Sequence, residues 1–332
     1  MDIFHKIVHG EENEYNFYKK PRGQKMKKFI IYLFTALCMS VIAALPFAGG
    51  ISELFSFLLN ANAVLVVSLC VLGFSLTSFL FGIITRDYSW VDRMWSLLPV
   101  AFVWYFACRG GFSIPLCLII ILVSIWGARL TFNFARKGGY TGIEDYRWII
   151  LREKIKNPFL WQLFSLFFIS FFQLGLFILF TWPVYSLLGT EASAPSVLTW
   201  VFAALGLFFI CFETIADQMQ WNFHKAKKSA GLQQNYDLKY SDDIKNGFLS
   251  QGLFASCRHP NYFGELGFWW TIWLLTLSVT GDIASSGYFG PLALTALFIG
   301  STIFTESITS SKYSEYKNYK KRVSSIIPWF PK

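Results

Sequence analysis

Charged residues are scarce in this chain, at 15% of 332 residues, whereas soluble domains carry about 25%. Hydrophobic residues make up 54% of the chain, and Phe alone contributes 36 residues. This composition excludes an ordinary soluble enzyme and a disordered chain. The sequence also has no low-complexity tract and no internal repeat, which argues against a fibrous protein and against a transporter built from inverted repeats.

Paired cysteines are missing as well. The six cysteines form no C-x-x-C pair, and five of them sit in apolar runs. Such cysteines are typical of packing residues, so the sequence predicts neither a disulfide framework nor a zinc site. The polar 28-residue N-terminal tail and the lack of a small-residue cleavage site argue against a removable signal peptide.

Long apolar runs, by contrast, are abundant. A membrane-spanning helix needs about 20 mostly apolar residues, and we find eight candidates: about 29–49, 62–84, 95–108, 113–133, 159–188, 196–217, 262–280 and 288–306. The third is short and ends at Arg109, and Pro183 is expected to break or kink the fifth. The sequence therefore predicts an all-α, polytopic transmembrane helical bundle of about seven to eight spans.

The basic residues predict the orientation of this bundle. Of the 29 Lys and Arg residues, 27 fall in segments on one side of the plan: 1–28, 85–94, 134–158, 218–261 and the C-terminal tail. Because basic loops stay in the cytoplasm, we expect both termini and the polar chemistry on that side. The net charge of +9 then reflects membrane orientation, and no nucleic-acid partner is expected. The expected parts are a cytoplasmic tail (1–28), a transmembrane hairpin (29–84) and a membrane domain (85–332).

Ionisable residues at membrane depth are costly, and here they concentrate in four places. The first is 87–96, where we expect Asp92 to be drawn toward the membrane; a helix N-cap or an ion pair with Arg93 is the alternative. The second place is 126–152, where four polar residues lie on one side of a helix that leaves the membrane: Arg129, Asn133, Arg136 and Lys137. A Gly-rich turn at 138–142 follows, and an amphipathic segment that contains Arg147 comes after it.

That Gly-rich turn between basic helices suits phosphate binding, because backbone N–H groups can approach a ligand closely there. No G-x-G-x-x-G or P-loop pattern is present, however. The alternative is that these basic residues only anchor the chain on the cytoplasmic side.

The third place is one face of a helix that leaves the sixth span: Glu213, Asp217, Gln220 and His224. Carboxylates inside an apolar helix could accept hydrogen bonds from an amide, a ribose or an Arg. A contact to another helix through an Arg is the structural alternative.

The fourth place is Ser256-Cys257-Arg258-His259-Pro260-Asn261-Tyr262-Phe263-Gly264-Glu265, where Pro260 is expected near a helix start. A helix N-terminus with Arg and His beside it attracts anions. Beyond the last span, polar and aromatic residues continue along one stripe: Glu306, Ser310, Tyr313, Tyr316, Tyr319 and Arg322.

The motif RHPNYFGE, preceded by GLF and followed by a Tyr/Lys-rich tail ending in IPWF, resembles the C-terminal domain of steroid 5-alpha-reductases. Over about 85–332 the chain looks still more like the uncharacterised membrane proteins grouped with that family, through WGARLTFNFARKGGYTGIEDYRW and the stretch 213–220. A similar motif occurs in sterol reductases, and a shortened one in isoprenylcysteine and phospholipid methyltransferases.

This resemblance implies a helical bundle that holds NADPH at its cytoplasmic end and transfers hydride to a polarised C=C bond of a lipidic substrate. The family's cofactor motif maps onto Asp217, Arg258, His259, Asn261, Tyr262 and Glu265, and the tail positions are Tyr313 and Arg322. Arg136, Arg147 and Glu213 are further cofactor-binding candidates, since phosphates need Arg and ribose needs acceptors. For the Glu and Tyr that polarise the carbonyl in steroid 5-alpha-reductases, the candidates here are Asp92 and Tyr105. No metal is expected.

Two other functions stay open. An S-adenosylmethionine-dependent membrane methyltransferase would share RHPNY, but such enzymes usually show an adjacent Glu-Glu pair where this chain has Thr305-Glu306. A non-catalytic lipid-binding protein on the same fold would bind no cofactor. The lipid bilayer is an expected partner in each case, in a bacterial inner membrane or an endoplasmic reticulum.

Overall fold

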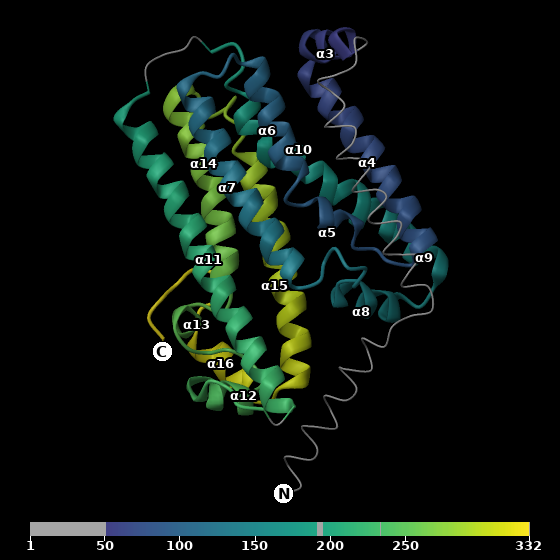
Figure 1. Ribbon diagram of the computed structural model, residues 1–332, viewed down its shortest axis with the longest axis vertical. Coiled ribbons are helices and arrows are strands. Elements are labelled where there is room, and N and C mark those ends of the chain that lie inside the picture. Colours follow the sequence, from purple (N-terminus) through teal and green to yellow (C-terminus); the bar gives the residue numbers. More distant parts are fainter. Residues whose placement is uncertain (1–50, 191–194, 233, 332) are drawn as a thin grey trace, which may run out of the picture. The chain divides into compact units, whose positions relative to one another are not determined.

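The computed structural model describes residues 51–190, 195–232 and 234–331, and in these ranges the chain is helical with no β-strand (Figure 1). The described residues form two compact units: unit 1 comprises those up to 94 and 132–171, and unit 2 comprises those of 95–131 and from 172 onward. The predicted all-α polytopic fold is confirmed. The predicted tail over 1–28 and the first span over 29–49 lie outside the described residues.

Unit 1 contains a long apolar helix and several short ones: α3 (Ile51–Asn60), α4 (Ala63–Thr85), α5 (Trp90–Met94), α8 (Tyr146–Ile155), α9 (Pro158–Phe164) and most of the π-helical η1 (Ser165–Phe172). Their ends follow from local capping. Asn62, Asp145 and Asn157 precede α4, α8 and α9, and each accepts a hydrogen bond from a backbone N–H of the first turn. A buried hydrogen bond from the Ser75 hydroxyl to the Ser170 carbonyl (3.3 Å) ties α4 to η1.

Unit 2 holds the longer helices: α6 (Leu98–Arg109), most of α7 (Ile114–Arg136), α10 (Gln173–Tyr185), α11 (Val197–Gly231), α14 (Pro260–Thr280) and α15 (Phe289–Lys312). The short elements η2 (Leu238–Tyr240), α12 (Ser241–Asn246), α13 (Leu253–Ser256) and α16 (Tyr316–Arg322) complete it. In Figure 1, α12, α13 and α16 gather where α11 and α15 end. The positive-inside pattern predicts that this end is cytoplasmic.

Glycines let α11 and α14 pack closely. A Cβ atom on Gly264 would lie 2.7 Å from the Glu213 Cβ, and one on Gly267 would lie 2.3 Å from the Phe209 ring. Only residues without a side chain permit this approach, which brings Glu213 of α11 next to the first turns of α14. The two helices therefore position the polar residues of the site.

Five helical segments in the described residues are long and apolar enough to cross a membrane: Ala63–Thr85, Ile114–Arg136, Pro158–Tyr185, Val197–Gly231 and Phe289–Lys312. The chain is thus a multi-pass helical membrane protein. The predicted spans 95–108 and 262–280 are not among the five. α6 has only 12 residues, and α14, with 21, carries the buried Glu265. Pro183 lies within α10, which continues to Tyr185, and the fifth span is instead irregular at η1.

Candidate functional site

The acidic face of α11 meets an arginine of α7. Arg129 Nη2 lies 2.6 Å from Glu213 Oε1, and Nη1 lies 2.7 Å from Asp217 Oδ2. All three side chains are buried, with exposed fractions of 9% or less. The Arg-paired helix contact, left open by the sequence, is what holds these carboxylates.

Glu265 of α14 joins the same cluster. It accepts hydrogen bonds from the indole N–H groups of Trp126 (2.8 Å) and Trp269 (3.3 Å), and its Oε2 lies 3.9 Å from Arg129 Nη2. We call Arg129, Glu213, Asp217 and Glu265 the acidic cluster. One guanidinium faces three carboxylates, so the cluster carries more acceptors than donors.

Unused polar atoms remain in the acidic cluster. Among the described residues, Glu213 Oε2 and Arg129 Nε are buried without a hydrogen-bond partner. A buried acceptor without a donor is costly, so a bound group that donates a hydrogen bond would be stabilised there. Further along α11, Gln220 Nε2 lies 3.2 Å from His224 Nε2.

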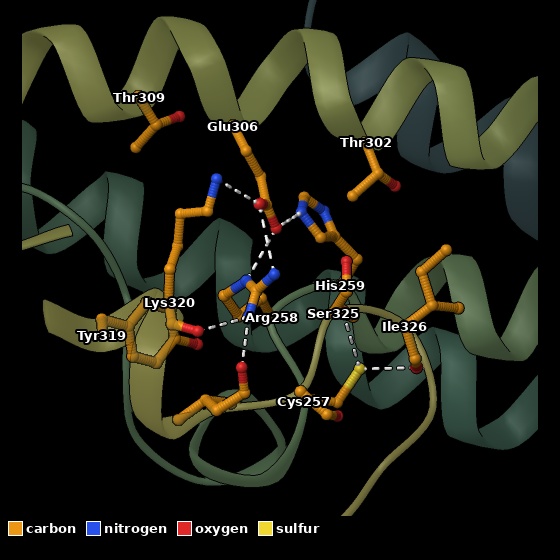
Figure 2. A network of polar contacts seen from close by, with 12 residues as sticks. Cys257, Arg258, His259, Thr302, Glu306, Thr309, Tyr319, Lys320, Ser325 and Ile326 are labelled. Carbon is orange, nitrogen blue, oxygen red and sulfur yellow. Dashed lines mark hydrogen bonds and ion pairs between the residues drawn. The ribbon is translucent and has the colours of Figure 1, made fainter. Parts of the chain in front are cut away.

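A second network surrounds Arg258, just before α14 (Figure 2). Its Nε and Nη2 donate to the two carboxylate oxygens of Glu306 at 2.7 and 3.2 Å, and its Nη1 donates to the carbonyls of Lys320 and Val323. Glu306, on α15, is 3% exposed and is also 3.0 Å from Lys320 Nζ and from His259 Nε2. We call these residues the Arg258 network.

The C-terminal tail is fastened to the same motif. The backbone N–H groups of Arg258 and His259 donate to the carbonyls of Ser324 (2.9 Å) and Ser325 (3.0 Å), and the Trp329 N–H donates to Ser256. Cys257 is buried and its Sγ donates to the Ile326 carbonyl at 2.7 Å (Figure 2). Burial raises the pKa of the Cys257 thiol to about 11, so it stays protonated and serves packing.

These contacts occupy much of Arg258. Its guanidinium binds a carboxylate and two backbone carbonyls, so Arg258 joins the start of α14 to α15 and the tail. The cofactor contact of Arg258 that the resemblance implies stays a prediction. The sequence indicated the importance of Arg258 but not its partner, because Glu306 lies 48 residues away.

The first turn of α14 carries two polar side chains, Asn261 and Tyr262, beside the Arg258 network. The Tyr262 ring stacks on His259 with ring centres 5.1 Å apart, and its hydroxyl is 3.5 Å from Ser301 Oγ. The half-buried Asn261 side chain makes no hydrogen bond to any other described residue. Asn261 thus presents a free amide, one helical turn before the buried Glu265.

The tail candidates lie at the end of unit 2 where α11 finishes. The Tyr313 hydroxyl accepts a hydrogen bond from Lys227 Nζ at 2.9 Å, which ties the tail to α11. Arg322 is exposed at the end of α16. Other exposed basic residues of α11 and α16 are Lys225, Lys228, Lys317 and Lys321. These basic residues lie at the end of the unit that the positive-inside pattern predicts to be cytoplasmic.

In unit 1, Asp92 neither caps a helix nor pairs with Arg93, the two structural alternatives that the sequence left open. Its Oδ2 accepts a hydrogen bond from Trp148 Nε1 at 2.7 Å, and its Oδ1 lies 3.8 Å from Arg147 Nη2. The alternative of an ion pair with Arg93 is not what the structure has, because Arg93 Nη2 lies 2.7 Å from Asp87 Oδ2 in a buried pair. Burial, followed by repulsion from Asp145, raises the pKa of Asp92 to about 6.

The predicted phosphate-binding turn uses its own amides. The N–H groups of Gly138, Gly139 and Thr141 donate to backbone carbonyls within 134–138, and the Gly139 carbonyl accepts from Arg93 Nε at 2.9 Å. Arg136 bonds to Asn133 Oδ1 at 2.8 and 3.0 Å. This geometry favours a structural turn over a phosphate site.

Two further candidates are engaged in local pairs. Arg147 binds Asp145 through Nε and Nη2, at 2.9 and 3.0 Å. The Tyr105 hydroxyl accepts from Arg109 Nη1 at 3.2 Å. Asp92 belongs to unit 1 and Tyr105 to unit 2, so their pairing across a substrate stays a prediction.

Residues 78–323 match the sequence pattern of a family described as "Protein of unknown function (DUF1295)". The chain is also 33% identical over 283 residues to "Uncharacterized protein C594.04c" of Schizosaccharomyces pombe, a match that covers 82% of this chain and 81% of the yeast protein. No solved structure matches the chain. The expected kinship with uncharacterised proteins is confirmed, and the link to steroid 5-alpha-reductases stays a prediction.

Proposed function

The chain belongs to the family described as Protein of unknown function (DUF1295), and we propose that it is a membrane-embedded, NADPH-dependent reductase of a C=C bond in a lipidic substrate. The substrate would be a steroid, sterol, polyprenoid or other enone lipid. NADPH, when bound, would supply the hydride, and the chain's own residues would bind, orient and exclude water. The reaction would take place at the cytoplasmic end of the bundle, in a bacterial inner membrane or an endoplasmic reticulum.

The observation that carries this proposal is the pair of unused polar groups where α14 meets α11. Asn261 has a free amide, and Glu213 Oε2 is a buried acceptor without a donor among the described residues. Gly264 lies between Asn261 and Glu265 in the chain and packs against Glu213. An amide and a carboxylate in this position suit the carboxamide and ribose hydroxyls of a nicotinamide nucleotide.

The phosphates of NADPH would need basic partners other than three of the arginines expected from the sequence. Arg136, Arg147 and Arg258 are each occupied by carboxylate, amide or carbonyl oxygens. The exposed basic residues at the end of α11 and on α16 remain available, and the bond from Lys227 ties α11 to Tyr313, which caps α15 shortly before α16 begins. We assign the phosphate contacts to this basic end, including Arg322.

Asp92 supports an acid role in the reaction. A carboxyl with a pKa of about 6 is protonated in roughly one molecule in ten at pH 7, and that form can donate a hydrogen bond to a carbonyl. This is the role that the Glu of steroid 5-alpha-reductases would have. Tyr105 would be its partner hydroxyl.

Binding of NADPH to the purified protein and to Asn261→Ala tests the proposal. Loss of a hydrogen bond to a neutral amide costs about 1 kcal/mol, so we expect roughly fivefold weaker binding by calorimetry. Asn60→Ala is the matched control, because the exposed Asn60 side chain of α3 hydrogen-bonds, among the described residues, to Ser56 alone. Equal NADPH affinity in Asn261→Ala and the wild type would contradict the assigned site.

A further inference from the structure

Unit 1 contains a basic pocket that the proposed reductase site does not use. Its volume is about 570 Å³, and it lies where the ends of α4 and α8 meet the start of α9. The polar and aromatic residues that line it are Arg86, Tyr88, Arg152, Lys156, Trp161 and Gln162. We call it the basic pocket.

The charges around the basic pocket are not balanced. Arg152 Nη2 lies 3.0 Å from the Glu144 carboxylate, but Arg86 and Lys156 form no ion pair with any described residue. Anchoring on the cytoplasmic side could explain single basic residues. It does not explain why three cations line one cavity, where an anion would lower their mutual repulsion.

The backbone at two of these cations is unusual. Arg86 and Lys156 have φ values of 52° and 54°, and the described residues contain only one other non-glycine residue with positive φ, Phe112. Both are helix C-caps, a position where glycine adopts this conformation without strain. Arg86 and Lys156 therefore occupy strained positions that glycine would fill without strain. The presence of a cation at both positions indicates that the positive charge itself has a role.

Two other lining residues of the basic pocket, Trp161 and Gln162, offer further polar groups. Gln162 Nε2 donates to the Tyr88 hydroxyl at 3.0 Å, whereas Gln162 Oε1 and Trp161 Nε1 are buried without a partner among the described residues. The Trp161 residue is only 3% exposed. The Arg152 guanidinium stands 5.6 Å from the Tyr88 ring centre and 5.8 Å from that of Trp161, so packing holds it in place.

The surroundings of the pocket are apolar. Ile83 and Pro158 also line it, and neighbouring side chains of α4 and α9 are exposed: Ile84 (67%), Phe159 (69%) and Leu160 (52%). Both helices lie in segments long and apolar enough to cross a membrane. A ligand seated in the pocket would therefore have acyl chains of the bilayer beside it.

We propose that the basic pocket binds the phosphate headgroup of an anionic membrane lipid. Arg86, Arg152 and Lys156 neutralise the phosphate, the Trp161 N–H supplies a neutral donor, and the lipid chains lie along Ile83, Ile84 and Phe159. The assignment is independent of the proposed reductase activity, since all these residues belong to unit 1 and none is assigned to NADPH.

The test uses the full chain purified in a neutral detergent and dihexanoyl phosphatidic acid as the probe, with binding measured by calorimetry. The variant Arg86→Gly/Lys156→Gly removes two charges and fits the positive φ at both positions, so it is expected to fold as well as the wild type. We expect at least tenfold weaker binding of the probe and an unchanged or higher Tm. Lys154→Gln, which removes an exposed charge of α8 outside the pocket, is the matched control and should bind as the wild type does.

Three results would overturn the proposal. The first is equal affinity in the double glycine variant and the wild type. The second is equally tight binding of dihexanoyl phosphatidylcholine, which would show that the pocket does not distinguish an anionic headgroup from a zwitterionic one. The third is displacement of the probe by inorganic phosphate or NADPH at similar concentration, which would identify a soluble phosphate compound as the ligand. Weak competition by both, together with loss of binding in the variant, would support a lipid.

Discussion

Arg258 and Glu306 form a buried, two-bonded ion pair, with Nε 2.7 Å from Oε1 and Nη2 3.2 Å from Oε2. Nη1 of the same guanidinium binds the carbonyls of Lys320 in α16 and of Val323 directly after it. One residue therefore connects the start of α14 with α15 and with the end of α16. The most specific motif of the sequence is thus a structural junction as well as the border of a candidate site.

Removal of the charge of Glu306 should destabilise the protein strongly. Glu306→Gln leaves Arg258 and Lys320 without their carboxylate, and breaking a buried ion pair costs about 3–5 kcal/mol. A lower Tm and faster proteolysis of the tail after α16 should result. Asp242→Asn, in an exposed ion pair with Lys245, is the control and should change Tm little. Equal Tm values for the two variants would contradict this role.

The acidic cluster predicts unequal costs for substitutions of its base and of one of its acids. Arg129→Met leaves three buried carboxylates without their cation and should cost about 3–5 kcal/mol. Glu213→Gln should cost less, because it removes one of the surplus negative charges. In the double variant the two costs should not add, which a double-mutant cycle of unfolding free energies measures. Additive costs would mean that the pair is not coupled.

The close approach of α11 and α14 predicts a cost for a single methyl group. Gly264→Ala places a Cβ 2.7 Å from Glu213 Cβ and 3.1 Å from its backbone, so the helices must shift, at about 1–3 kcal/mol. Gly300→Ala on α15 is the matched control, since no atom lies within 4 Å of its Cβ position. That variant should be neutral or more stable, because Ala favours helix over Gly by about 1 kcal/mol. The reverse order of Tm values would refute the packing.

The largely desolvated carboxyl of Asp92 predicts a pH dependence of stability. Its pKa is raised from 3.8 to about 6 in the folded chain, so the folded state binds the proton more tightly than the unfolded state. The resulting stabilisation is present below pH 4 and is lost as the pH rises through 6, by an amount on the order of 3 kcal/mol. Unfolding measured between pH 4 and 7 should therefore show a fall in the wild type that Asp92→Asn lacks. Parallel curves for the two proteins would contradict the raised pKa.

Some of this structure could be predicted from local sequence. Long apolar runs predicted the membrane helices, Pro260 marked the first residue of α14, and the spacing of Glu213 and Asp217 placed both on one helix face. These features depend on periodicity and on short-range capping. The apolar length rule was insufficient for α6, which begins only at Leu98 and ends as a 12-residue helix.

The partners of the charged residues could not be predicted in the same way. Arg129 bonds to acids 84 and 88 residues away, and Arg93 pairs with Asp87 rather than with its neighbour Asp92. Such pairs depend on how helices pack, which a single sequence does not encode in its spacing. The same holds for the turn at 138–142, whose amides are satisfied within the chain.

The most direct test of the proposed function is which cofactor stabilises the folded protein. We would compare the Tm of the detergent-purified protein with NADPH, NADH and S-adenosylmethionine. A ligand at 100 times its Kd stabilises the folded state by about 2.7 kcal/mol. A rise in Tm with NADPH, and none with S-adenosylmethionine, is the predicted result. A rise with S-adenosylmethionine alone would contradict the reductase and indicate a methyltransferase, and no rise with any of the three would indicate a non-catalytic lipid-binding protein.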